Sequence, residues 1–463
     1  MSVLLISACG GGSDEQKPEV IPFGLQSSVA AKGDRVSDIA FAPDGRMFFA
    51  EQFTGDIRVV STGGQLLAEP FAHVDVQNYL DLDWGLTSVA VDPAFAQNHY
   101  VYAFYTGPAE AASPLPHLDR QAQLPTPTPP GETPAPTRTP GQSGTPAASG
   151  GQASGSTTPA ARQALPRGQP ILVRFTDRSN TGADETVISD TFPVTAANHA
   201  GYNANGKIRF GPDGALYASV GDYDYTAEES PVQDLSTPIG KLLRIDASTG
   251  AAASGNPFTD DPAADPRVFA FGFREPFGFA FHPKTAAIYG TDNTPDTCEE
   301  LNIVRAGQNY SWPDVGAFPF ADCNAGKGVP AIYHFSREGT DPGQFLSFVE
   351  VSELTFAPGT RYPALGDSLF VCESQRSAVG GKITSGVLRR LVLGGPGFDQ
   401  VTGNDIIVHD CKGAVVTAPD GTVYYANATE IRKLEPGAAT SGSAAGSSSR
   451  AAASGSPAAS PSR

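Results

Sequence analysis

The chain has 463 residues and a formal net charge of −18, from 49 acidic and 31 basic residues. It contains no run rich in lysine and arginine, so nucleic acid is excluded as an expected partner. No stretch reaches the roughly 20 apolar residues that a membrane helix needs. An acidic balance with Asp-rich loops suits calcium, and an acidic soluble surface is the simpler alternative.

The N-terminus resembles the end of a bacterial lipoprotein signal, because Ile6-Ser7-Ala8 precedes Cys9. This resemblance implies lipidation of Cys9 and a protein outside the cytoplasm, anchored to a membrane and facing the periplasm or the cell exterior. The segment has no basic region before its apolar run, and that run is shorter than in an ordinary signal. A tail without a targeting role is the alternative.

Six segments share one pattern: a β-rich run, a turn opened by proline, and a second β-rich run. They are residues 37–51, 85–105, 206–222, 278–292, 352–372 and 413–427. A short third strand, usually with a basic residue, follows each hairpin, at 55–60, 171–175, 241–245, 300–305, 387–391 and 430–434. Repeats of a four-stranded unit predict an all-β fold, a six-bladed β-propeller of antiparallel blades. Chance hairpins in a β-sandwich are the alternative.

The propeller domain is predicted to span residues 20–436, between a signal remnant with a linker at 1–19 and a tail at 437–463. The last repeat lacks a fourth strand, so we expect residues 20–31 to supply it and to close the ring. Residues 108–170 and 437–463 consist mainly of small and polar residues and proline, and are predicted to be disordered. The first of these segments separates two strands of one blade.

Four cysteines remain when Cys9 is set aside. An even number in an exported protein suggests two disulfides, and none of the spacings is typical of a zinc site. We predict the pairs Cys298–Cys323 and Cys372–Cys411, because each pair lies within one or two neighbouring repeats.

Polar residues that the hairpins do not need precede three of the innermost strands. They are Asp83, Asn198-His199 and Arg274, and a propeller would gather them at one mouth of its channel. A histidine on a polar, glycine-containing loop suits proton transfer. Each residue also has a structural alternative: a solvated or structural His199, an inter-blade salt bridge for Arg274, and a turn cap for Asp83.

The chain resembles the soluble glucose/sorbosone dehydrogenase family of propellers, which use pyrroloquinoline quinone (PQQ). The matching stretches are Asn198-His199 with 207–222, then 271–279 and 299–313. The resemblance covers most of residues 20–436 apart from the insert. It implies that His199 is the general base that takes the proton of a sugar's C1 hydroxyl as hydride passes to the quinone. It also implies that Arg274 contacts the quinone.

The same resemblance implies two calcium sites. Backbone carbonyls of Thr294 and Pro295 would hold the ion that polarises the quinone. Glu299, Glu300 and a backbone carbonyl of Tyr310 would hold the second ion.

Several positions depart from the family pattern. Asn198 stands where an acid is usual, Asp83 where Gln or Glu is usual, and Glu275 where Asn is usual. PQQ is a tricarboxylate and needs several cations. The usual lysine and arginines on the far side of the channel are missing, so Arg376 and Lys412 would have to take their place.

The sequence leaves three functions open. The first is an exported aldose dehydrogenase that uses PQQ and calcium, with a small sugar as substrate and a separate electron acceptor. The second is a non-catalytic propeller lipoprotein that binds a sugar or a partner protein; the missing cations favour it, and His199 with Arg274 opposes it. The third is a calcium-dependent, lactonase-like hydrolase, which would need several acids or amides around one metal in the channel.

Overall fold

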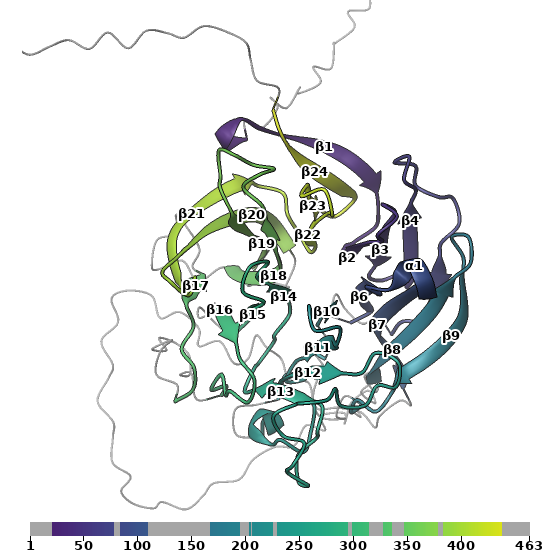
Figure 1. The fold of residues 1–463 in the computed structure, drawn as a ribbon, viewed down its shortest axis with the longest axis vertical. Coiled ribbons are helices and arrows are strands. Elements are labelled where there is room, and N and C mark those ends of the chain that lie inside the picture. Colours follow the sequence, from purple (N-terminus) through teal and green to yellow (C-terminus); the bar gives the residue numbers. More distant parts are fainter. Residues whose placement is uncertain are drawn as a thin grey trace, which may run out of the picture.

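The computed structural model describes residues 21–77, 84–109, 167–194, 203–204, 206–225, 229–294, 299–313, 327–335, 347–377 and 383–437. Six four-stranded antiparallel sheets surround a central axis, as Figure 1 shows. The predicted six-bladed β-propeller is therefore confirmed. No helix in these ranges is long and apolar enough to cross a membrane.

Each blade begins with its innermost strand and proceeds outwards. Blade 1 consists of β2 (Val36–Phe41), β3 (Met47–Glu51), β4 (Asp56–Val60) and β5 (Ala72–His73). Blade 2 consists of β6 (Leu86–Val91), β7 (Tyr100–Ala109), β8 (Arg167–Asp177) and β9 (Gly182–Ser189). Blade 3 consists of β10 (Ile208–Phe210), β11 (Leu216–Val220), β12 (Lys241–Ile245) and β13 (Val268–Phe271). A four-residue helix, α1 (Phe95–Asn98), lies between β6 and β7, and short 3-10 turns lie at Pro22–Gly24 and Pro231–Gln233.

Blades 4 to 6 follow the same order. Blade 4 consists of β14 (Phe279–Phe281), β15 (Ile288–Asp292), β16 (Glu299–Val304) and β17 (Tyr333–Phe335). Blade 5 consists of β18 (Ser347–Ala357), β19 (Ser368–Ser377), β20 (Ile383–Gly394) and β21 (Gln400–Val408). Blade 6 consists of β22 (Val415–Thr417), β23 (Val423–Ala426), β24 (Glu430–Pro436) and β1 (Leu25–Lys32). All six predicted hairpins and all six third strands are found in these blades.

Local turn chemistry explains why the hairpins recur. In the turns β2–β3, β10–β11 and β22–β23, an aspartate carboxylate accepts a hydrogen bond from the backbone N–H two residues later, at 2.9–3.2 Å. The glycine that follows each aspartate has φ between 80° and 92°, which a residue with a side chain rarely adopts. The Asp-Gly pairs therefore specify these turns without help from the rest of the fold.

The ring is closed by the N-terminal strand, as predicted. β1 pairs antiparallel with β24, from Leu25 opposite Pro436 to Lys32 opposite Glu430. Since β24 would otherwise be the edge of blade 6, β1 covers backbone groups that would remain unpaired.

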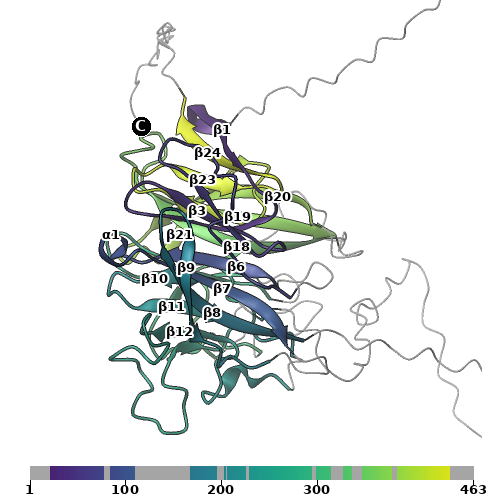
Figure 2. The ribbon, with the colours of Figure 1, turned by 90° about the vertical axis from the view of Figure 1, so that its right-hand side faces the viewer.

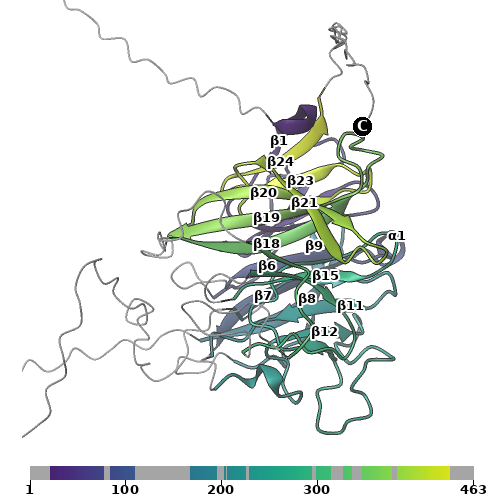
Figure 3. The ribbon, with the colours of Figure 1, turned by 90° about the vertical axis from the view of Figure 1, so that its left-hand side faces the viewer.

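The two faces of the propeller differ. In the side views the β7–β8 and β19–β20 hairpins project from one face, and α1 lies at the opposite face (Figures 2 and 3). We call the first the insert face, because β7 and β8 lead to residues 110–166 there. We call the second the turn face, because it carries the β6–β7 and β10–β11 turns.

Strand pairing extends into both ends of the segment predicted to be disordered. Pro108–Ala109 of β7 pairs with residues 167–168 of β8, and pairing continues through Pro170. Composition does not reveal this, because an established ladder can continue through residues that would not start one. Residues 110–166 and the predicted tail from 438 lie outside the described ranges.

One predicted disulfide is confirmed. Cys372 on β19 bonds to Cys411, which precedes β22, and the bond joins blades 5 and 6 across a sequence separation of 39. Chain entropy gives a loop of this length a stabilisation of about 4 kcal/mol. Cys298 and Cys323 lie outside the described residues, so their pairing stays a prediction.

Candidate functional site

The structure describes only part of the predicted site. Arg274, Thr294, Glu299, Glu300, Tyr310 and Lys412 are described in full. The backbone of Arg376 belongs to β19, but its side chain is not described. Cys9, Asp83, Asn198, His199 and Pro295 lie outside the described ranges, so their roles stay predictions.

Arg274 lies between β13 and β14 on the insert face and is only 5% exposed. Its guanidinium donates a hydrogen bond to the Asn293 carbonyl at 3.1 Å and lies 3.5 Å from an Asp224 carboxylate oxygen. Burial alone would lower the pKa of Arg274, but Asp222, Asp224 and Glu275 raise it above its ordinary value. Because Asp224 follows β11 of blade 3, the inter-blade salt bridge considered from the sequence is present.

Asp222 connects three segments around Arg274. Its Oδ1 accepts hydrogen bonds from Asn203 Nδ2 at 3.1 Å and from the Asp224 N–H at 2.8 Å, and its Oδ2 accepts one from Trp312 Nε1 at 3.0 Å. Burial raises the pKa of Asp222 to about 6, although Arg274 acts in the opposite direction. The carboxylate therefore holds Trp312 in place, and the Trp312 ring centre lies 5.9 Å from the guanidinium carbon.

Two further carboxylates are buried on the other side of Arg274. Asp292 Oδ2 accepts a hydrogen bond from the Arg274 N–H at 3.1 Å, and Asp292 lies opposite Glu300 in the β15–β16 pairing. Burial raises the pKa of Asp292 well above its usual range, and Glu300 raises it further. Burial also raises the pKa of Glu300 to about 7. Asp292 Oδ1 also accepts a hydrogen bond from the Glu275 N–H at 2.6 Å, and Glu300 Oε2 accepts one from Asn302 Nδ2 at 3.0 Å. The two carboxylates therefore already have protein partners, and each keeps further oxygen lone pairs of the kind that calcium binds.

The predicted calcium ligands are only partly brought together. Glu299 and Glu300 are consecutive in β16, so their side chains point to opposite faces of the blade. The Tyr310 hydroxyl donates a hydrogen bond to the Ile303 carbonyl at 2.7 Å. The predicted calcium ligand is a different group, the backbone carbonyl of Tyr310. Among the described residues there is no group of three or more His, Cys, Asp or Glu side chains that could hold a metal ion.

The described cations do not by themselves fit a tricarboxylate. The charge of Arg274 is shared among surrounding carboxylates. Lys412 lies just before β22, the innermost strand of blade 6, and its Nζ lies 3.9 Å from Asp410 Oδ1. A binding site for PQQ therefore depends on residues beyond those that the structure describes.

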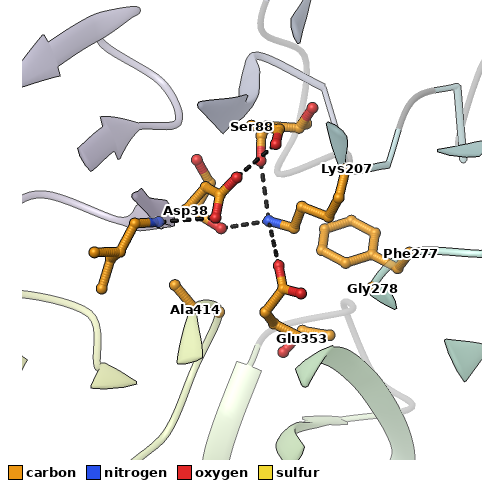
Figure 4. A network of polar contacts seen from close by, with 12 residues as sticks. Asp38, Ser88, Lys207, Phe277, Gly278, Glu353 and Ala414 are labelled. Carbon is orange, nitrogen blue, oxygen red and sulfur yellow. Dashed lines mark hydrogen bonds and ion pairs between the residues drawn. The ribbon is translucent and has the colours of Figure 1, made fainter. Parts of the chain in front are cut away.

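The structure also reveals a network on the axis that the sequence analysis missed (Figure 4). Arg209 binds Asp38 through two contacts of 2.8 Å and Glu353 through one of 2.7 Å. Lys207 Nζ donates to the carbonyls of Ser37 and Thr87 and lies 3.6 Å from Glu353 Oε2. Asp38, Arg209 and Glu353 lie on the innermost strands of blades 1, 3 and 5. Lys207 directly precedes the innermost strand of blade 3.

This network crosses the channel below the insert face. The Lys207 side chain is completely buried, and its Nζ lies 4.8 Å from the centre of the Phe277 ring. Burial raises the pKa of Glu353 to about 7, with Arg209 and Lys207 opposing that shift. The sequence carried a signal for it, since charges interrupt the short innermost strands SDIAF, KIRF and SELTF.

Comparison with known proteins adds independent evidence. A family model described as glucose/sorbosone dehydrogenase matches residues 34–120 and 161–434. The chain is 26% identical over 269 residues to aldose sugar dehydrogenase YliI of Escherichia coli. This alignment covers 56% of this chain and 66% of that protein. The chain is 21% identical over 298 residues to quinoprotein glucose dehydrogenase B of Acinetobacter calcoaceticus, covering 60% of this chain and 50% of that protein.

A solved structure shares the whole fold. It is a putative oxidoreductase (glucose dehydrogenase) from Thermus thermophilus, with 25% sequence identity and a TM-score of 0.61. The alignment covers 89% of this chain and 100% of that one. The matches to five curated relatives, by contrast, span 44 to 66% of the relatives' lengths.

Proposed function

Because the chain belongs to the glucose/sorbosone dehydrogenase family, we propose that it is a sugar dehydrogenase that oxidises the C1 hydroxyl of an aldose with PQQ and calcium. The observation that carries the proposal is the family match, which includes strands of all six blades. The buried position of Arg274 on the insert face, where the resemblance expects it, supports the proposal.

The proposed roles of the chain's own residues follow from their chemistry. His199, as a neutral imidazole, takes the proton of the C1 hydroxyl, since its ordinary pKa lies near neutrality. Arg274 is held in one orientation by Asp224 and the Asn293 carbonyl, so it could donate a hydrogen bond to the quinone without first being ordered. PQQ, when bound, would accept the hydride.

Calcium would be held by the carbonyls of Thr294 and Pro295 and, at the second site, by Glu299, Glu300 and the Tyr310 carbonyl. Glu300 is buried and lies opposite Asp292 in the β15–β16 pairing. These carboxylate oxygens close to Thr294 support the proposal, because calcium binds oxygen ligands.

Reconstitution tests the proposal. The purified protein is incubated with PQQ and Ca²⁺, and dye reduction is measured over a panel of aldoses. His199→Gln should lower kcat by about 10²–10⁴ with the fold unchanged. The matched control is His73→Gln, because His73 is exposed on β5, an outermost strand.

A second candidate is a non-catalytic, sugar-binding propeller. The shortage of uncommitted cations among the described residues favours it. The same preparation separates the two functions. Saturable sugar binding without PQQ binding at micromolar concentrations, in the presence of Ca²⁺, would support the second candidate. Full activity of His199→Gln would remove the proposed base.

We also propose that Cys9 is lipidated and that the protein is an extracytoplasmic, membrane-anchored lipoprotein. The sequence Ile6-Ser7-Ala8-Cys9 supports this. Metabolic labelling with a radioactive fatty acid should label the wild type in its native host and not Cys9→Ser. Equal labelling of both would contradict the assignment.

A further inference from the structure

Asn293 connects blade 4 to blade 5 on the insert face. It directly follows β15 and is only 4% exposed. Its side-chain Oδ1 accepts a hydrogen bond from the Val351 N–H at 2.8 Å, and its Nδ2 donates one to the Val351 carbonyl at 3.1 Å. Val351 lies on β18, the end strand of the blade 5 sheet. The Asn293 amide therefore pairs with the edge of β18 as a neighbouring strand would.

This pairing gives the Asn293 side chain a single orientation. Val351 offers one backbone donor and one backbone acceptor, and the amide satisfies both only when its oxygen faces the N–H and its nitrogen faces the carbonyl. Val351 is completely buried, so loss of the amide would deprive two buried backbone groups of this partner.

The backbone of Asn293 contacts the segment that carries Arg274. The Asn293 carbonyl accepts a hydrogen bond from the Arg274 guanidinium at 3.1 Å, and the Asn293 N–H donates one to the Glu275 carbonyl at 3.1 Å. Asp292 accepts hydrogen bonds from the N–H groups of Arg274 and Glu275 at 3.1 and 2.6 Å. Residues 292–293 and 274–275 are therefore joined through both backbone and side chains.

The two ends of Asn293 thus act on different blades. Its side chain is anchored to blade 5, and its N–H is anchored to the segment before β14 of blade 4. Because the residue is held at both points, the direction of its carbonyl is fixed as well. That carbonyl accepts the Arg274 hydrogen bond, and its peptide bond leads to Thr294.

We propose that Asn293 is a positioning residue of the candidate dehydrogenase site: its amide, anchored to Val351, sets the direction of the carbonyl that orients Arg274. The consequence for catalysis rests on the proposed function, whereas the placement of Arg274 does not. The same anchor would fix the start of the segment whose Thr294 carbonyl is a proposed calcium ligand. An asparagine that only joined two blades would contribute to stability and leave Arg274 unchanged.

The N–H resonances of the Arg274 guanidinium test this placement without any bound group. They are recorded by NMR of the full chain labelled with ¹⁵N-arginine, and Arg274→Lys assigns them. In Asn293→Ala their exchange with solvent should be faster by about ten-fold, as expected for the loss of one hydrogen bond to a charged group. Asn293→Asp has the same shape and keeps the acceptor for the Val351 N–H but not the donor, so it should show a smaller increase.

The matched control is Asn256→Ala. Asn256 is also 4% exposed, and its Nδ2 donates hydrogen bonds to the carbonyls of Arg244 and Pro266 at 2.8 and 2.9 Å, between β12 and β13. Asn256→Ala should lower Tm about as much as Asn293→Ala and leave the Arg274 resonances unchanged. Circular dichroism confirms that each variant is folded; if Asn293→Ala is not, Asn293→Asp is compared with the control.

Reconstitution with PQQ and Ca²⁺ then connects placement with activity. If the wild type reduces the dye, Asn293→Ala should lower kcat by roughly 10- to 10²-fold, and Asn256→Ala should keep the wild-type value.

Unchanged Arg274 resonances in folded Asn293 variants would overturn the proposal. So would equal changes in Asn256→Ala, since lost stability would then be the cause, or a wild-type kcat for Asn293→Ala in an active enzyme. An inactive wild type that still shows the expected change at Arg274 would support the placement and contradict only the proposed dehydrogenase function.

Discussion

Lys207, Arg209, Asp38 and Glu353 bring two positive and two negative charges together on the propeller axis. Lys207, Asp38 and Glu353 are almost completely buried. Removing one partner of a buried pair leaves the other charge without compensation, which costs more than the pair itself contributes. The network therefore makes the innermost strands depend on one another.

Lys207→Met should lower the free energy of unfolding by about 2–3 kcal/mol, because the buried Ser37 and Thr87 carbonyls lose their donor while Glu353 keeps Arg209. Urea denaturation followed by fluorescence measures the change. The control is Lys284→Met, which breaks an exposed pair with Asp367 and should cost at most about 1 kcal/mol. Equal losses of unfolding free energy in the two variants would show that the buried axial contacts contribute no more to stability than an exposed ion pair.

Asp222 should make stability depend on pH. Its pKa is about 6 in the folded protein, above its ordinary value of 3.8, so the folded state binds the proton more tightly. The stabilisation that comes from this tighter proton binding is therefore fully present below pH 3.8 and is lost as the pH rises through 6. Relative to Asp222→Asn, the free energy of unfolding of the wild type should rise by on the order of 1 kcal/mol when the pH falls from about 7 to about 5.

Urea unfolding at several pH values measures this difference. Asparagine cannot accept the Trp312 hydrogen bond with its amide nitrogen, but that loss is the same at every pH. A constant difference between wild type and variant across this pH range would contradict the raised pKa.

At the scale of the element, hairpins were predictable because their causes are local. An aspartate that bonds the backbone two residues later and a glycine with positive φ specify a turn within four residues. The axial network was not predicted, because Arg209 and Asp38 are 171 positions apart and meet only once the ring exists. Arg274 was predicted from its place just before an innermost strand, and the family resemblance added its role. Its partner Asp222 was taken only as the end of a hairpin.

The β7–β8 hairpin should tolerate loss of its insert. Ala109 and Arg167 are directly opposite each other, so an Asn-Gly turn in place of residues 110–166 can join the strands. We expect a change in Tm of no more than a few degrees, measured by differential scanning calorimetry. The control replaces residues 110–166 with a longer Gly-Ser linker; unfolding of both variants would mean that the insert contributes to the fold.

At the scale of the whole molecule, six blades form a ring only when β1 reaches β24. Deleting residues 21–32 should expose the edge of β24 and cause loss of stability and self-association. Analytical ultracentrifugation and thermal unfolding measure both effects. A synthetic peptide of residues 21–32 should restore the monomer, and a scrambled peptide should not. A stable monomer without β1 would contradict this account of closure.

Ring closure also determines when the protein can finish folding during its synthesis. The Ser27 side chain hydrogen-bonds to the Tyr425 hydroxyl, which lies 398 positions later in the chain. At about 5–20 residues per second, the ribosome needs roughly 20–80 s to make the residues between them. Throughout that time β1 has left the ribosome without its partner strand. Its unpaired edge is exposed to other nascent chains, so protection from aggregation matters most before the last blade is translated.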